Sequence, residues 1–278
     1  MAGFPSTPPD AEQGTTMTYR IWSAALVTLL AASPAFATEP FEGTWRLDLT
    51  SLSTPTRPSE RLLKDGTFTC ATCTPRMVVK ADGAFHAVTD DPYADEEMVQ
   101  VVDDHVVKAA FRKGGKDMGS NTTTISPDGK TMTVVDTDLS APDGKPIVTT
   151  YTMARVAEGP SGAHVISGKW LRNKMDAAPG NVTYSWKMAD GKLVFSGPGG
   201  YTYAAVPGGP AVPMVGDVGG TTVKVERVSA NVMREYNYRQ GKLVEVGTYT
   251  VSGDGKSMTG RIEDKLNGQV RSATAYRQ

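Results

Sequence analysis

The chain has 278 residues, a length that accommodates two ordinary domains. Hydrophobic residues make up 39% of it and charged residues 21%, which is the balance of a soluble globular protein. Its 29 basic and 30 acidic side chains give a net charge of −1, so no global field favours binding to nucleic acid or to an anionic membrane. The 29 Gly and 18 Pro residues favour turn-rich β structure.

The first 37 residues are predicted to be a non-native upstream extension followed by a signal peptide. Residues 17–20 supply a positively charged start, residues 21–32 are apolar, and Ala35-Phe36-Ala37 matches a small-x-small cleavage site. The apolar run is shorter than the ~20 residues that a membrane span needs. Residues 1–16 are polar and rich in Pro, so we expect Met17 to be the true start. The mature protein would begin near Thr38 in an exported, oxidising compartment, periplasmic or secreted.

The next element in chain order is an alternating segment at residues 41–50. Phe41, Gly43, Trp45 and Leu47 share one face, and polar side chains share the other, which predicts a half-buried strand. Further short strands separated by Asp-Gly turns follow up to residue 156. They are interrupted by an acidic loop at residues 90–97.

The clearest hairpin signal occurs twice. Residues 122–133 and residues 248–259 each read as strand, Asp-Gly turn and strand, with Asp128 and Asp254 lying 126 residues apart. Trp45 and Trp170 repeat at an offset of 125, and Arg155 and Arg277 at an offset of 122. The offset suits a duplicated domain. We predict an all-β protein with one unit at residues 38–157, a linker at 158–163 and a second unit at 164–278. Eight or nine strands in each would close as an antiparallel up-and-down barrel.

These residues resemble the lipocalin-like (calycin) β-barrels, and in particular exported bacterial lipocalin-like proteins of undefined role. In that superfamily a Gly-x-Trp motif opens the first strand, and an Arg near the end of the last strand lies against the Trp ring. The resemblance implies that a Trp–Arg contact of this kind closes one end of each barrel. Gly43 and Trp45 would belong with Arg155, and Gly168 and Trp170 would belong with Arg277. It also implies a ligand cavity in general, without specifying ligand-binding residues. Arg172 departs from the pattern, since the first unit has Leu47 at the equivalent place.

Cys70 and Cys73 are the only cysteines. No His follows them, so attachment of a c-type haem is excluded, and no βαβ pattern supports a redox site. A Zn²⁺ site would need two more ligands, for which His86 and His105 are available. In an exported protein we expect a structural disulfide, which requires a turn between the two cysteines.

The remaining chemistry-bearing residues leave alternatives open. The acidic loop at residues 90–97 is either a Ca²⁺ site or a solvated loop, and it lacks the EF-hand spacing. The three histidines, His164 included, lie in no recognisable catalytic motif. Aromatic side chains of the second unit either line an apolar pocket or fill the barrel core: Tyr184, Trp186, Tyr201, Tyr203, Tyr236 and Tyr238.

These observations favour a non-catalytic binding protein for a small apolar or amphipathic ligand, held in the second unit. The alternative is a structural or interaction protein of the cell envelope with both barrels filled, and an enzyme of unknown type comes third. We expect no cofactor, no bound metal, no nucleic-acid partner and no transmembrane span in the mature protein. The oligomeric state stays open.

Overall fold

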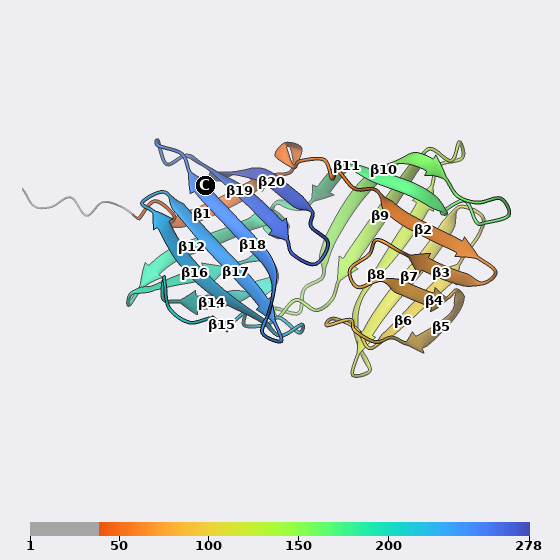
Figure 1. The fold of residues 1–278 in the computed structure, drawn as a ribbon, viewed down its shortest axis with the longest axis horizontal. Helices are drawn as coiled ribbons and strands as arrows, with labels where there is room; N and C mark the ends of the chain where they lie inside the picture. Colours follow the sequence, from red (N-terminus) through yellow and green to blue (C-terminus); the bar gives the residue numbers. More distant parts are fainter. Residues whose placement is uncertain (1–38) are drawn as a thin grey trace, which may run out of the picture. The chain divides into compact units, whose positions relative to one another are not determined.

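The structure is a computed structural model that describes residues 39–278. The expected upstream extension and signal peptide lie outside the described residues. Within the described part, the strands form two antiparallel sheets of ten strands each. Figure 1 shows these two sheets. The predicted all-β fold with two barrel-like sheets is confirmed, although each sheet has ten strands and not eight or nine.

One sheet, here called the continuous sheet, uses a single stretch of chain. Its strand order is β4-β3-β2-β11-β10-β9-β8-β7-β6-β5, and β4 lies against β6 where the barrel nearly closes. Its strands are β2 (Ser59–Lys64), β3 (Thr67–Cys70), β4 (Met77–Lys80), β5 (Asp82–Ala87), β6 (Glu96–Val101), β7 (Val106–Lys113), β8 (Lys116–Ile125), β9 (Thr131–Asp138), β10 (Ile147–Glu158) and β11 (Gly168–Ala177).

The other sheet, here called the split sheet, combines the first strand of the chain with the C-terminal strands. Its order is β14-β13-β12-β1-β20-β19-β18-β17-β16-β15. Its strands are β1 (Gly43–Asp48), β12 (Thr183–Ala189), β13 (Lys192–Ser196), β14 (Thr202–Ala205), β15 (Val212–Pro213), β16 (Thr221–Ser229), β17 (Val232–Arg239), β18 (Lys242–Val251), β19 (Ser257–Asp264) and β20 (Val270–Arg277). Three short 3₁₀ turns complete the regular structure described, namely η1 (Leu49–Ser51), η2 (Pro179–Val182) and η3 (Pro198–Gly200).

The two sheets do not follow the two halves of the repeat. The N-terminal strand β1 pairs with β12 and β20, whereas β11 pairs with β10 and β2 (Figure 1). The two Gly-x-Trp strands have therefore exchanged sheets. This corrects the expected division into residues 38–157 and 164–278, because one barrel comprises residues 59–177 and the other comprises residues 43–48 with 183–277.

The connection between β10 and β11 explains this exchange. Only residues 159–167 separate the two strands, and antiparallel strands joined by a short connection pair with each other. The pairing runs from Thr149 opposite Ala177 to Glu158 opposite Gly168. The expected linker at residues 158–163 thus lies in this hairpin. The chain passes from one sheet to the other at residues 49–58 and 178–182 instead.

Both Trp–Arg closures form, but with exchanged partners. The guanidinium carbon of Arg155 lies 4.1 Å from the ring centroid of Trp170, and that of Arg277 lies 4.3 Å from the centroid of Trp45. The predicted pairs Trp45–Arg155 and Trp170–Arg277 are wrong, because each Trp follows its own strand into the other sheet. The residue types and their stacking are as expected.

Each closing Arg also fastens the chain that leads into the Gly-x-Trp strand. Arg155 donates hydrogen bonds to the carbonyl oxygens of Val165 and Ser167, which precede β11. Arg277 does the same for Pro40 and Glu42, which precede β1. The two closures are therefore equivalent in detail, which supports a common origin for the two halves.

Backbone conformation and space explain why each Gly-x-Trp motif begins with glycine. Gly43 and Gly168 both have φ of +133°, a conformation that other residues avoid. A Cβ on Gly43 would lie 2.5 Å from Nη1 of Arg277, and one on Gly168 would lie 2.9 Å from Nη1 of Arg155. The missing side chain makes room for the guanidinium that covers the indole.

Candidate functional site

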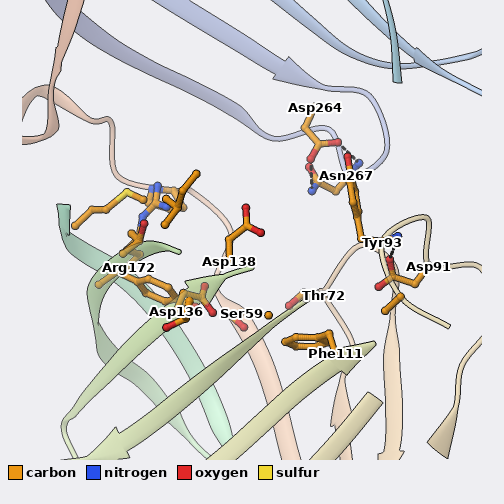
Figure 2. A pocket seen from close by; sticks show the side chains of 18 of the residues that line it. Ser59, Thr72, Asp91, Tyr93, Phe111, Asp136, Asp138, Arg172, Asp264 and Asn267 are labelled. Atoms are coloured by element: carbon orange, nitrogen blue, oxygen red, sulfur yellow. Dashed lines mark hydrogen bonds between the residues drawn. The ribbon is translucent and has the colours of Figure 1, made fainter. Parts of the chain in front are cut away.

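The larger pocket of the described residues belongs mainly to the continuous barrel. It has a volume of about 880 Å³. Figure 2 shows Arg172, Asp136 and Ser59 on one side, Asp91 and Tyr93 on the other, and Phe111 below. Two residues at the end of β19, Asp264 and Asn267, also line it.

Strand register explains which side chains reach this pocket. On β9 the inward positions are Met132, Val134 and Asp136, and the first two are buried in the apolar core. Their partners on β10 are Met153, Tyr151 and Thr149 in that order. The inner face therefore changes along the strands from an apolar floor to a polar upper level.

The apolar floor is the core of the continuous barrel. The indole of Trp170 is fully buried, and Met153 beside it is 6% exposed. Both also line the pocket, together with Phe111 and Met118. A ligand entering the pocket would therefore meet an apolar surface at its inner end.

The upper level contains four ionisable side chains, which are Arg61, Asp136, Tyr151 and Arg172. Burial raises the pKa of the Asp136 carboxyl, and the charge of Arg61 partly opposes that shift. Burial also raises the pKa of Tyr151, against which both arginines act. Burial lowers the pKa of Arg172, and the charge of Arg271 adds to this effect. Arg61 thus acts on both Asp136 and Tyr151, and Arg172 acts on Tyr151, inside a partly desolvated site.

Most carboxylates around the pocket already have local partners. Asp91 accepts a hydrogen bond from the backbone N–H of Tyr93, at 2.7 Å. Asp138 accepts from both the backbone N–H and the hydroxyl of Ser140, at 2.7 and 2.6 Å. These bonds shape the loops at the rim of the pocket, and both carboxylates keep free acceptor sites and their negative charge.

The aromatic side chains predicted to bind a ligand do not act as one group. Tyr184, Trp186 and Tyr203 are brought together in the core of the split barrel, where Trp186 and Tyr203 are each 2% exposed. The Trp186 Nε1–H donates to the Tyr203 hydroxyl, which donates to Glu235 at 2.6 Å. This cluster fills the barrel.

The other three predicted aromatic residues lie apart from that cluster. The hydroxyl of Tyr236 donates to Glu226 at an exposed position. Tyr238 pairs with Thr222 across β16 and β17. Tyr201 contacts the hydroxyl of Ser140 at 3.0 Å and lines the larger pocket.

A smaller pocket of about 480 Å³ is lined mainly by residues of the split barrel. Phe195, Asn237 and Arg239 contribute to its lining, and Tyr201 does so again. Of the six predicted aromatic residues, Tyr201 is thus the one that lines both pockets.

The sequence does not mark the polar residues of the larger pocket as a site. Arg172 stands out in it only as a departure from the repeat. Asp136, Tyr151 and Arg61 stand on strands whose alternation was visible, yet the inward face of a strand cannot be identified as a pocket until the barrel closes around it.

The predicted disulfide is present. Cys70 and Cys73 are bonded, with their Cα atoms 5.4 Å apart, and the turn between β3 and β4 brings them together. Cys70 is fully buried against the core.

The histidines have local structural partners. His86 contacts Asp82 at 2.8 Å, His105 contacts the carbonyl of Ile125, and His164 contacts the carbonyl of Asp103. Within residues 39–278, no group of three or more His, Cys, Asp or Glu side chains is arranged to hold a metal ion.

The acidic loop contributes one unusual carboxyl group. Glu97 is 3% exposed, and its Oε2 has no hydrogen-bond partner among residues 39–278. Burial, with a smaller effect from the charge of Asp91, raises the pKa of Glu97 to about 7. Two other carboxylates of the loop bind locally: Asp91 accepts from the N–H of Tyr93, and Asp95 accepts from the N–H of Gly114.

Helices of membrane-spanning length and hydrophobicity are absent from residues 39–278. No known protein family, no curated protein and no solved structure matches this chain.

Proposed function

We propose that the protein is an exported, lipocalin-like binding protein that holds a small amphipathic ligand in the continuous barrel and performs no catalysis. The pocket of about 880 Å³ carries this proposal. Its volume falls within the ~300–1,000 Å³ that small-molecule sites occupy. We place the ligand in the continuous barrel and not in the second unit, because three of the six aromatic residues expected to bind it, Tyr184, Trp186 and Tyr203, pack in the core of the split barrel.

The export proposal has independent support. A disulfide is typical of proteins that fold in oxidising compartments, and Cys70–Cys73 is bonded. The signal-like pattern of residues 17–37 agrees with it. N-terminal sequencing of the protein from the periplasm or the medium tests this, and a mature chain that retains residues 1–16 would contradict it.

Ligand binding is tested by filling the pocket. Thr149 lines the pocket, while its neighbour Val148 faces outward and is 43% exposed. We expect the neutral fluorescent probe N-phenyl-1-naphthylamine to bind the full chain. Thr149→Phe should weaken binding by about tenfold or more, since added bulk displaces the probe, and Val148→Phe should leave it unchanged. Equal behaviour of the two variants, or no binding at all, would contradict the proposal.

The filled split barrel favours a second candidate function. Trp186, Tyr203 and Glu235 are all buried in its core. A protein of the cell envelope that acts through its outer surfaces needs a packed core of this kind and no internal ligand site. A purified protein without any extractable small molecule, and with no affinity for the neutral probe, would favour this function.

A further inference from the structure

We propose that the smaller pocket is a second binding site, which takes a small organic ammonium ion with a hydrocarbon substituent at the Oδ1 atom of Asn237. This inference goes beyond the proposed function, because the site belongs mainly to the split barrel and needs no ligand in the continuous barrel. The pocket volume of about 480 Å³ lies within the ~300–1,000 Å³ that small-molecule sites occupy.

The first observation is a buried acceptor without a donor. Asn237, on β17, lines the pocket, and its Oδ1 is buried with no hydrogen-bond partner among residues 39–278. The amide nitrogen of the same side chain donates to two carboxylates, those of Glu235 at 3.2 Å and Glu245 at 3.4 Å. Turning the amide over would set its oxygen against both carboxylates, so the described orientation is the favourable one. A donor supplied by a ligand would complete the hydrogen bonding of this side chain.

The second observation is that the donors of this wall are already used. The hydroxyl of Tyr203 donates to Glu235 at 2.6 Å, and Arg271 donates to Glu245 at 2.7 Å. Glu235 is 7% exposed and forms no ion pair within residues 39–278. The wall behind Asn237 is therefore rich in acceptors and short of positive charge.

The third observation is the charge of the lining. The ionisable acids and bases are three carboxylates and two guanidinium groups, namely Asp217, Glu245, Asp264, Arg239 and Arg271. The side chains that line only the larger pocket add three aspartates and three arginines, so the excess of one carboxylate stays the same when both pockets are counted. Both guanidinium groups are engaged, since Arg239 lies 4.9 Å from the ring centroid of Tyr93 and Arg271 binds Glu245. A single cation therefore balances the lining, whereas an anion does not.

The apolar part of the lining selects the kind of cation. Phe195, Met214, Val244 and Leu266 line the pocket, and Tyr201 adds a second aromatic ring. An ammonium ion beside an aromatic face gains cation–π attraction, and a carbon substituent covers apolar surface. A hydrated metal ion would leave that surface uncovered. The lining therefore matches a primary ammonium group on a short hydrocarbon chain.

The experiment compares hexylamine with 1-hexanol, which has the same chain length and no charge. Each is titrated by calorimetry into the full-length protein at about pH 7.5, where an alkylamine is protonated. We expect hexylamine to bind about tenfold more tightly than 1-hexanol, and Asn237→Leu to weaken hexylamine by roughly tenfold or more, as loss of a hydrogen bond to a charged group does. Glu245→Gln keeps the shape of the side chain and removes its charge. It should weaken hexylamine and leave 1-hexanol unchanged.

The matched control is Glu226→Gln, since Glu226 is exposed on β16 and lines neither of the two pockets described. It should leave the affinity for hexylamine unchanged, and circular dichroism should show the variants folded. If Asn237→Leu does not fold, Glu245→Gln carries the test. Equal affinities of hexylamine and 1-hexanol would overturn the ammonium site. A loss with Glu245→Gln no larger than with Glu226→Gln would also overturn it.

Competition with N-phenyl-1-naphthylamine separates this site from the ligand of the continuous barrel. Hexylamine should not displace the neutral probe, and Asn237→Leu should leave binding of the probe unchanged. Displacement of the probe by hexylamine, with full affinity in Asn237→Leu, would place the amine in the larger pocket and overturn this inference. Tighter binding of Ca²⁺ than of hexylamine, with the same dependence on Glu245, would also overturn it. Failure of the probe alone to bind would contradict the proposed function and leave this site intact.

Discussion

At the residue scale, Glu97 ties stability to pH. Its carboxyl group is buried without a full set of partners, and its pKa rises from 4.5 to about 7 on folding. Asp91 acts on it through its charge, and His86 is opposite it in β5, where it is held by Asp82. A raised pKa means that the folded state binds the proton more tightly than the unfolded state does. The resulting stability is fully present below about pH 4.5 and is lost as the pH rises through about 7.

We therefore predict that Glu97→Gln flattens the pH dependence of unfolding. Between about pH 5 and pH 8, the wild type should lose roughly 2–3 kcal/mol more unfolding free energy than the variant, given the cost of ionising a buried carboxyl. Urea unfolding at each pH measures this. Glu96→Gln on the same strand, where the side chain is half-buried, is the control. Parallel curves for wild type and Glu97→Gln would show that this carboxyl does not behave as described.

Gly168 also contributes at the residue scale. We expect Gly168→Ala to lower the free energy of unfolding by about 2–3 kcal/mol, because the residue has φ of +133° and an added Cβ would clash with the carbonyl oxygen of Ala157 and crowd Nη1 of Arg155. Gly180→Ala is the matched control, since a Cβ there meets nothing within 4 Å. It should cost less than about 1 kcal/mol. If both substitutions cost the same, the Gly-x-Trp motif has no steric requirement for glycine.

At the element scale, the hairpin of β10 and β11 decides which stretch of chain is a complete barrel. Residues 59–177 contain every strand of the continuous sheet, with the Trp170–Arg155 closure and the disulfide. Residues 38–157 contain β1, which belongs to the other sheet, and lack β11. The complementary edges of β10 and β2 would then be left unpaired.

We predict that residues 59–177 fold alone and that residues 38–157 do not. The first segment should show a cooperative thermal transition and dispersed amide resonances, since its core is complete. The second should remain unfolded or aggregate. A cooperative transition for residues 38–157 would mean that β1 can replace β11 in the continuous sheet, and would argue that the exchange of strands is not fixed.

At the scale of the whole molecule, β1 brings the N-terminal end of the described chain into the same sheet as its C-terminal strand β20. Trp45 and Phe41 are both fully buried in the core of the split barrel, and β1 fills the space between β12 and β20. Removing residues 39–48 would leave that sheet open at its centre. The continuous sheet would lose no strand.

We therefore predict two separate transitions for a chain that begins at residue 59. The split barrel should unfold at a markedly lower temperature than in the full chain, because it loses two large aromatic side chains worth about 3–5 kcal/mol each. The continuous barrel should keep its own transition. Calorimetry measures both, and an unchanged thermogram would contradict the placement of β1.

The sequence by itself determined the local structure of the short segments. The Asp128-Gly129 and Asp254-Gly255 turns form where they were predicted, with Gly φ of +70° and +69°, because the turn chemistry lies within a few residues. The disulfide follows for the same reason, since Cys70 and Cys73 share one turn. The residue types of both closures could also be identified, because a Gly, a Trp and an Arg recur at matching places.

Only the tertiary structure decided which copy pairs with which. A duplicated sequence offers two equivalent sites for each Gly-x-Trp strand, so the repeat does not distinguish Arg155 from Arg277 as the partner of Trp45. The short connection after β10 settles the choice by holding β11 beside it. The pocket was hidden for a related reason. Arg61, Asp136, Tyr151 and Arg172 come from four strands, and they share an interior only once the sheet curves to bring those strands around one space.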